Sequence, residues 1–231
     1  MTPNMTHLES ELQHLKVGIM EMWAIVISQI EKSKTALLKV DKDMAREIKI
    51  TEKRVDSYEL KIDTDCENIL ALYAPVAIDL RFVLSVLKIN YNLERIGDYA
   101  DGIAQIIEGL DKPFKTEHFK ETKILEMFDI CVSIMSDTLL AFEKEDSQLG
   151  RSILKRDEEL DKINETAHIA VGELIINMPD YAHHSLALFS IIRKLERAGD
   201  HTQNIAEELI FFMEAKVLKH KGKVHSKRNI G

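Results

Sequence analysis

The sequence predicts an all-α protein made of two tandem three-helix bundles, and three observations support this fold class. Glycine and proline are scarce, at 9 and 4 among 231 residues, whereas sheets and loop-rich folds need more turn residues. Leu, Ile, Glu, Lys and Ala fill the chain instead, and these residues favour long helices. The third observation is an internal repeat, in which the segment Leu93–Asp98 (LERIGD) recurs as Leu195–Asp200 (LERAGD).

Six helices are expected from the spacing of apolar residues and the placement of proline. Pro75 and Pro179 lie where proline is tolerated, at the opening of a helix, and Asp111–Pro113 forms the clearest linker. We therefore expect a first bundle over residues 1–112, a second over 113–218 and a basic C-terminal tail over 219–231. The expected helices cover approximately residues 6–31, 35–72, 76–110, 117–142, 146–176 and 181–218.

The composition limits the cellular role. A net charge of −8 and a pI of about 5.6 make the chain a poor general binder of nucleic acid, because phosphate neutralisation needs clustered Lys and Arg. Cys66 and Cys131 lie in apolar helical patterns and are expected to be reduced core residues, which fits a cytoplasmic protein. There is no signal-peptide pattern, and the most apolar stretch, Ile19–Ile30, is short and contains Glu21. We expect contact with a membrane only through partner proteins.

Each half contains two pairs of acidic residues spaced i, i+4, so that both carboxylates of a pair lie on one helix face. The acids interrupt apolar stripes, since Glu94 and Asp98 continue the stripe of Leu87 at about 100° per residue. Arg95 and Arg197 adjoin the acids but are expected to point about 100° away. The paired residues are Glu52, Asp56, Glu94, Asp98, Asp157, Asp161, Glu196 and Asp200, with Glu59, Asp101 and Glu207 as possible additions.

Hairpin geometry is expected to bring these pairs together. If the second and third helices fold back near Pro75, residue n faces about residue 150 minus n. A turn near Pro179 likewise brings the two acidic pairs of the second half opposite each other, although the separation of the pairs along the chain differs between the halves. The residues expected to face each other are Asp56 and Glu94, Glu52 and Asp98, Asp161 and Glu196, and Asp157 and Asp200.

Carboxylates gathered at a helix seam repel one another, so protons, Arg or Lys, or metal ions must neutralise them. Oxygen-rich sites without thiolates suit hard or borderline cations such as iron, manganese, magnesium or zinc. The alternative interpretation is a solvated face with scattered salt bridges, and the sequence leaves it open.

No catalytic constellation stands out. A ferritin-like di-iron site needs Glu-x-x-His on two helices, and this chain has one such motif, Glu165 to His168, with His168 expected at the rim of the seam. His183 and His184 open the last predicted helix and are expected to face solvent. The basic run 216–228 is expected to be a solvated tail, with a weak contact to an acidic partner or lipid surface as the alternative. We therefore expect a protein that is not an enzyme.

The repeated motifs resemble those of the PhoU family. Leu93–Asp98 and Leu195–Asp200 are similar to the two signature repeats of the family, and Asn204–Glu208 to their continuation. Pro75–Arg81 (PVAIDLR) resembles the Pro-Val-Ala-x-Asp-Leu-Arg segment of the family. The match extends over nearly the whole chain, and several motifs in one order are more specific than any one of them.

This resemblance implies two three-helix bundles and multinuclear clusters of iron or zinc, held by the four Glu/Asp-x-x-x-Asp pairs. It implies a negative regulator of phosphate uptake and phosphate-starvation signalling. Such a regulator binds the ATPase subunit of the phosphate ABC transporter and a phosphate-sensing histidine kinase, and we also expect a homodimer. The alternative function is a carboxylate-bridged metal oxidase or metal-storage protein, which is disfavoured because these seams offer almost no imidazole.

The chain departs from the family pattern at three places. Tyr73-Ala74 precedes Pro75 where the family often has Arg-Gln, and Ala198 replaces Ile. The third acidic motif begins with Asp157, one methylene shorter than Glu, which leaves the nuclearity of the second cluster open. The identity and role of the metal, the oligomeric state and the surfaces that contact each partner are likewise open.

Overall fold

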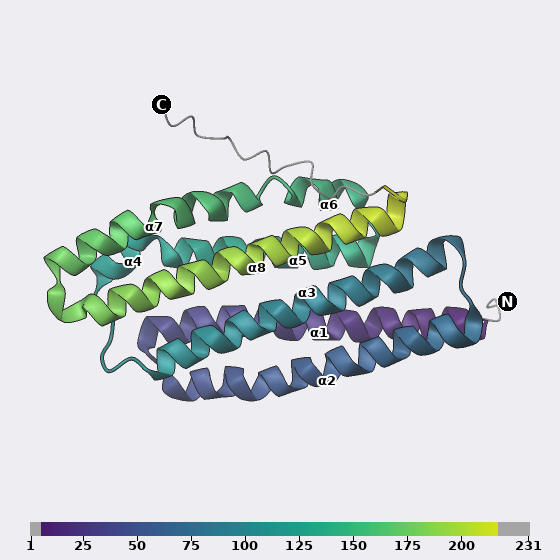
Figure 1. The fold of residues 1–231 in the computed structure, drawn as a ribbon, viewed down its shortest axis with the longest axis horizontal. Coiled ribbons are helices and arrows are strands. Elements are labelled where there is room, and N and C mark those ends of the chain that lie inside the picture. The colour runs from purple at the N-terminus through teal and green to yellow at the C-terminus, as the bar shows by residue number, and fades with distance from the viewer. Residues whose placement is uncertain (1–5, 217–231) are drawn as a thin grey trace, which may run out of the picture.

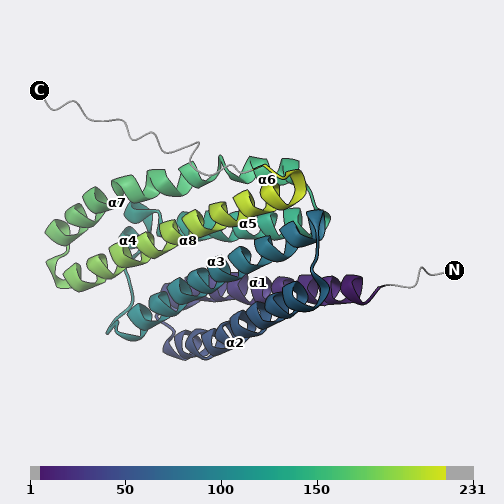
Figure 2. The same ribbon diagram turned by 45° about the vertical axis from the view of Figure 1, so that its right-hand side comes forward.

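The computed structural model describes residues 6–216, and within them it is all-α, which confirms the predicted fold class. The helices lie lengthwise beside one another in two halves, α1 to α3 and α4 to α8 (Figures 1 and 2). No described helix has a stretch both long and apolar enough to cross a bilayer. The elements are α1 (His7–Lys39), α2 (Lys42–Tyr73), α3 (Ala77–Glu108), α4 (Thr116–Thr122), α5 (Ile124–Lys144), α6 (Ser147–Ile153), α7 (Asp157–Asn177), the 3-10 turn η1 (Pro179–Tyr181) and α8 (Ala182–Glu214).

The first helix is longer than predicted. It was expected to end near Glu31, but it runs to Lys39, because no residue between them breaks the helix and the turn into α2 comes after Lys39. Val40 adopts a left-handed conformation with φ of 51°. The Asp41 carboxylate then accepts hydrogen bonds from the Asp43 and Met44 amides and caps α2.

In the second half, two predicted helices are each broken once. Lys123 adopts φ of 53° and separates α4 from α5, a conformation that non-glycine residues rarely take. Leu154–Arg156 separate α6 from α7, and the Arg156 guanidinium there pairs with Asp137 and lies 3.0 Å from Ser133 Oγ on α5. The boundary predicted at residue 113 falls between α3 and α4. The last helix ends at Glu214, before the predicted end at 218, and the tail over 219–231 lies outside the described residues.

The α2–α3 hairpin has the predicted register. Near the turn, Cys66 Sγ lies 3.9 Å from the Val83 carbonyl oxygen. Further along, Asn90 Nδ2 donates to the Glu59 carbonyl oxygen at 2.9 Å, and still further the Glu52 carboxylate lies against Gly97. These contacts agree to within one residue with the predicted pairing, so the acidic motifs of the two helices face each other.

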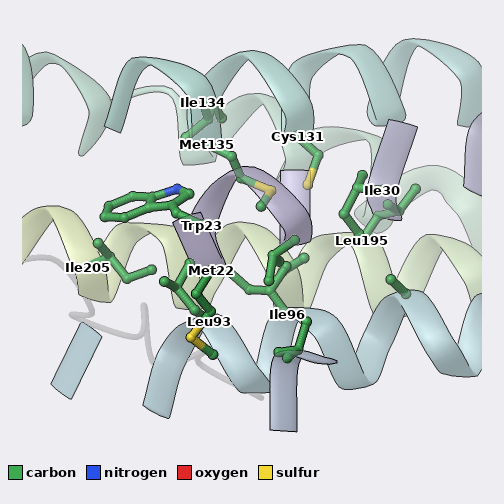
Figure 3. Close-up of a cluster of buried hydrophobic side chains, with 14 of the residues drawn as sticks. Met22, Trp23, Ile30, Leu93, Ile96, Cys131, Ile134, Met135, Leu195 and Ile205 are labelled. Atoms are coloured by element: carbon green, nitrogen blue, oxygen red, sulfur yellow. The ribbon is translucent and has the colours of Figure 1, made fainter. Parts of the chain in front are cut away.

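The two halves share one hydrophobic core. Figure 3 shows its centre, where side chains from α1, α3, α5 and α8 meet. Trp23 of α1 lies with its ring centroid 5.9 Å from that of Phe142 of α5, so the contact crosses from one half to the other. Cys66 and Cys131 are both buried thiols, as predicted. Because the core is continuous, we expect the halves to fold and unfold together.

Helices α3 and α8 run antiparallel and form the main contact between the halves (Figures 1 and 2). His201 lies at its middle, with Nδ1 2.8 Å from Asn92 Oδ1 and Nε2 3.3 Å from the Tyr99 hydroxyl. Further out, Lys88 Nζ lies 2.9 Å from a carboxylate oxygen of buried Glu208. This register places the two repeated segments side by side.

Candidate functional site

The first acidic seam lies between α2 and α3, and Glu52 is one of its two buried acids. The side chain is only 8% exposed, and Gln29 Nε2 donates to its Oε2 at 2.7 Å. Its Oε1 has no hydrogen-bond partner among the described residues. The carboxylate fits there because Gly97 has no Cβ, which would lie 2.8 Å from Oε1. The glycine of the first repeat therefore makes room for this acid.

Burial raises the pKa of Glu52 to about 7, and the charges of Asp56, Asp98 and Asp101 push it in the same direction, partly opposed by the Gln29 hydrogen bond. Asp98 lies across the seam, as predicted for the partner of Glu52. At neutral pH this carboxyl is thus divided between its protonated and ionised forms.

Glu94 is the second buried acid of this seam. It is 8% exposed, and burial together with the Asp98 charge raises its pKa to about 7, with Arg95 opposing this shift. From α2 the Glu59 charge contributes to the shift of Glu94. Glu59 lies about one turn beyond Asp56, which was the residue expected opposite Glu94.

Arg95 does not point away from the acids, contrary to the expectation from helical angle. Its Nε lies 2.8 Å from Glu94 Oε2 and its Nη1 lies 2.9 Å from Asp98 Oδ2. The guanidinium carbon also lies 5.3 Å from the centroid of the Tyr91 ring. The angular argument applies to Cβ, whereas the long arginine side chain can fold back along the helix. Arg95 therefore neutralises part of the first seam.

Of the three possible additions to the acidic pairs, Glu59 and Asp101 lie along the first seam. The pKa of Glu59 is raised by burial and by the charge of Asp63. Asp63 in turn accepts a hydrogen bond of 2.9 Å from Asn90 Nδ2. Asp101 is half-buried and accepts a hydrogen bond from Gln105 Nε2, and Glu207, on α8, is half-buried.

The second seam lies between α7 and α8. Burial raises the pKa of Glu196, and the charges of Asp200 and Asp161 add to this shift. Asp161 on α7 therefore faces Glu196 on α8, as predicted. Asp200 is half-buried and Asp161 is exposed. Asp157 begins α7, but its side chain lies outside what the structure describes.

The donor chemistry of the seams fits a cation, but the donors are not assembled into a coordination shell. The oxygen of Glu52 without a partner and the raised pKa values of Glu52 and Glu94 reflect uncompensated negative charge. Among the described residues, however, no group of three or more His, Cys, Asp and Glu side chains is arranged to hold a metal ion. Arg95 occupies the position between Glu94 and Asp98 where a cation would compete.

Sequence reasoning missed a histidine cluster near the α3–α4 connection. His184 was expected to face solvent, yet it is buried, and its Nε2 lies 2.9 Å from the Lys112 carbonyl oxygen. His118 is fully buried, and neither of its ring nitrogens has a hydrogen-bond partner among the described residues. Burial lowers its pKa. The signal available in the sequence is that Phe114 and Phe119 flank His118. In the structure the rings of Phe114 and Tyr181 lie with centroids 5.6 and 5.1 Å from that of His118.

The fold and the seams define the class of protein: an all-α chain of two repeated helical halves, each with facing Glu and Asp residues along one hairpin. The sequence profile of the PhoU domain matches residues 19–107 and 124–209, one match in each half. The chain belongs to the PhoU family, which confirms the resemblance seen in the motifs.

Relatives and solved structures agree with this assignment. A protein of Thermotoga maritima, described as "Phosphate-specific transport system accessory protein PhoU homolog 1", is 30% identical over 92% of this chain and 91% of its own length. The crystal structure of PhoU from Pseudomonas aeruginosa is similar, with a TM-score of 0.84 and 27% identity over 91% of this chain and 100% of that one. The phosphate transport system regulatory protein PhoU from Streptococcus pneumoniae has a TM-score of 0.80 at 27% identity, over 92% of this chain and 99% of its own.

Proposed function

We propose that this protein is a negative regulator of phosphate uptake and phosphate-starvation signalling. In this role it binds the ATPase subunit of the phosphate ABC transporter and a phosphate-sensing histidine kinase. The observation that supports the proposal most directly is the match to the PhoU domain in both halves, together with relatives of similar length described as accessory proteins of a phosphate-specific transport system.

The proposed regulator acts by binding and does not catalyse a reaction. It works in the cytoplasm, as a homodimer, and meets the membrane only through the transporter and the kinase. The description of one similar structure as a regulatory protein supports this view. The seams gather buried and exposed carboxylates between paired helices, which suits recognition of a cation.

We also propose that each seam binds iron or zinc through its facing acidic pairs. Glu52, Asp56, Glu94 and Asp98 would hold the metal in the first half, and the equivalent acids on α7 and α8 in the second. A bound cation would supply the positive charge that the buried carboxylates lack. In the first half it would displace Arg95 from Glu94 and Asp98. Elemental analysis of protein purified without chelator tests the proposal.

A double variant separates the two seams. Glu94→Gln with Asp98→Asn is expected to remove the metal of the first half and to leave that of the second half in place. Unchanged metal content in this variant would show that the ligands are assigned incorrectly. No metal in the unmodified protein would instead favour the solvated-face interpretation.

Deletion of the gene in its host tests the regulatory role. In phosphate-rich medium the deletion is expected to switch on a phosphate-starvation reporter, and a plasmid copy of the gene is expected to silence it again. The competing function is a carboxylate-bridged oxidase or metal store. A silent reporter, together with catalytic oxidation of ferrous iron by the purified protein, would replace the regulator with that enzyme.

A further inference from the structure

The start of α1 and the turn between α2 and α3 lie at the same end of the molecule (Figure 1). An open groove lies there. Its volume is about 570 Å³, and residues from α1, α3, α8 and the α5–α6 turn line it. Leu12, Ile78, Phe82 and Phe212 supply its apolar surface. The groove includes part of the PVAIDLR segment, which neither acidic seam uses.

The floor of the groove is closely packed. Phe82 is 8% exposed and lies with its ring centroid 5.3 Å from that of Phe212 and 6.2 Å from that of Phe142. Phe142 in turn contacts Trp23 in the shared core. Arg81 Nε donates to the Phe212 carbonyl oxygen at 3.2 Å and fixes the end of α8 beside the groove. A preformed surface of this kind loses little conformational entropy when a partner binds.

Exposed apolar side chains continue from the groove onto the α2–α3 turn. Ile78 lines the groove and is 49% exposed, and Val76, two residues before it, is 72% exposed. Leu72, at the end of α2, is also exposed. Contiguous exposed apolar surface next to a groove is typical of a protein interaction site.

The charges around the groove are mainly negative. Three carboxylates, of Glu9, Asp79 and Glu145, stand against one ammonium, of Lys16. Lys16 Nζ lies 2.7 Å from Glu145 Oε1 and neutralises that acid. Glu9 is held in the capping box of α1 by Thr6. Asp79 has no ion-pair partner within the described part of the chain, so its carboxylate is available to a cation from outside.

We propose that this groove binds a helix of the transporter's ATPase subunit, one that inserts an apolar side chain between Ile78 and Phe82 and places Lys or Arg beside Asp79 and Glu9. A helix is the natural occupant because helices form the walls of the groove, and the described residues contain no strand to extend. The ATPase subunit is the transporter component named in the proposed function, and relatives are described as accessory proteins of a phosphate-specific transport system. The inference rests on the proposed function and adds the surface and the chemistry of the contact.

The test measures binding of the full-length protein to the purified ATPase subunit and, separately, to the cytoplasmic part of the kinase. Ile78→Ser removes the apolar contact, and Asp79→Asn removes the unpaired charge with little change of side-chain shape. Matched controls lie on α7, where Ile176 is 80% exposed and Glu173 is an exposed acid. The controls are Ile176→Ser and Glu173→Gln.

Each groove variant is expected to weaken binding of the ATPase subunit about tenfold or more, and neither control is expected to change it. Added salt is expected to weaken binding of the unmodified protein more than that of Asp79→Asn. Groove variants that bind the ATPase subunit as tightly as the unmodified protein would overturn the inference and leave the proposed regulation intact. Failure of the unmodified protein to bind either partner would overturn both.

Other occupants of the groove would give different results. If the groove variants lose kinase binding and keep ATPase binding, the occupant is assigned incorrectly. If they instead abolish self-association in sedimentation experiments, the groove receives a second copy of this chain. If changing Lys219, Lys221 and Lys223 to Gln tightens binding of the ATPase subunit, the tail of the chain competes for the groove. The first two of these results refute the proposed occupant, whereas the third supports it, because the tail and the ATPase subunit can compete only for the same surface.

Discussion

Replacing Glu52 by Gln is expected to stabilise the metal-free protein above neutral pH. Glutamine has nearly the same shape, can still accept the hydrogen bond from Gln29 Nε2 and still fits against Gly97. The substitution removes only the charge, which the fold tolerates poorly because burial raises the pKa of Glu52 to about 7 from its ordinary 4.5. In the unmodified protein the cost of this charge is absent below the ordinary pKa. It grows as the pH rises towards 7 and is complete above it.

The size of the effect follows from the two pKa values. A rise from 4.5 to about 7 corresponds to about 3 kcal/mol between the neutral and ionised forms, at about 1.36 kcal/mol per pH unit. Solvent around the exposed neighbours Asp56 and Asp98 screens part of this, so we expect a gain of about 1–2 kcal/mol for Glu52→Gln at about pH 8. At about pH 4.5 we expect almost none, because the carboxyl is then mostly protonated in the folded state.

Urea unfolding followed by circular dichroism, with a chelator present, measures the free energy of unfolding at both pH values. Repeating the series with zinc or iron is expected to reverse the sign, because the variant lacks a proposed ligand and gains less from bound metal. Glu67→Gln is the control, since Glu67 is exposed on the same helix, and it is expected to have no effect in either series. A destabilised Glu52→Gln in chelator at about pH 8, or a gain that does not depend on pH, would refute the reasoning.

Three further predictions concern other parts of the molecule. Arg95→Gln is expected to raise the affinity for a divalent cation severalfold, because the cation no longer competes with the guanidinium for Glu94 and Asp98. Isothermal titration calorimetry measures this affinity, and a weaker affinity would contradict the proposed site. His118→Phe is expected to gain stability relative to the unmodified protein as the pH falls below 6.5. Burial lowers the pKa of His118 in the folded protein, so this histidine is protonated first in the unfolded chain. A pH series of unfolding free energies checks this, and a difference that stays constant would argue against it. Trp23→Ala is expected to lower the free energy of unfolding by about 3–5 kcal/mol while unfolding remains a single transition, because this side chain joins the cores of the two halves. Two separate transitions in calorimetry of the unmodified protein would show that the halves are independent.

The three helices of the first half and the facing of the acids could be predicted because both depend on periodicity. Apolar spacing marks a helix, and a hairpin at Pro75 fixes which residues face each other to within one residue: Glu52 was expected beside Asp98, and its carboxylate lies against the adjacent Gly97. Helix ends were harder to place. Val40 and Lys123 take left-handed conformations without being glycine, and their local sequence contains no signal for a turn.

The details of the site depend on side-chain rotamers, which sequence spacing does not determine. Cβ directions place Arg95 away from the seam, yet the guanidinium reaches Glu94 and Asp98. The burial of His118 and His184 depends on how the connection between α3 and α4 folds over the N-terminal end of α8. The groove beside Ile78 could not be predicted either, since it forms from four segments that are distant in the sequence.

The contact between Tyr99 and His201 has a consequence for how such a chain could arise. In the two repeats these residues occupy equivalent positions, directly after Asp98 and Asp200, and their side chains meet at 3.3 Å. In a dimer of one shorter chain, a residue on the twofold axis would meet its own copy, and every substitution there would appear on both sides. Fusion of two copies into one polypeptide removes that constraint. Tyrosine can then face histidine, a pairing that no symmetric dimer could place on its axis, and each half is free to diverge on its own.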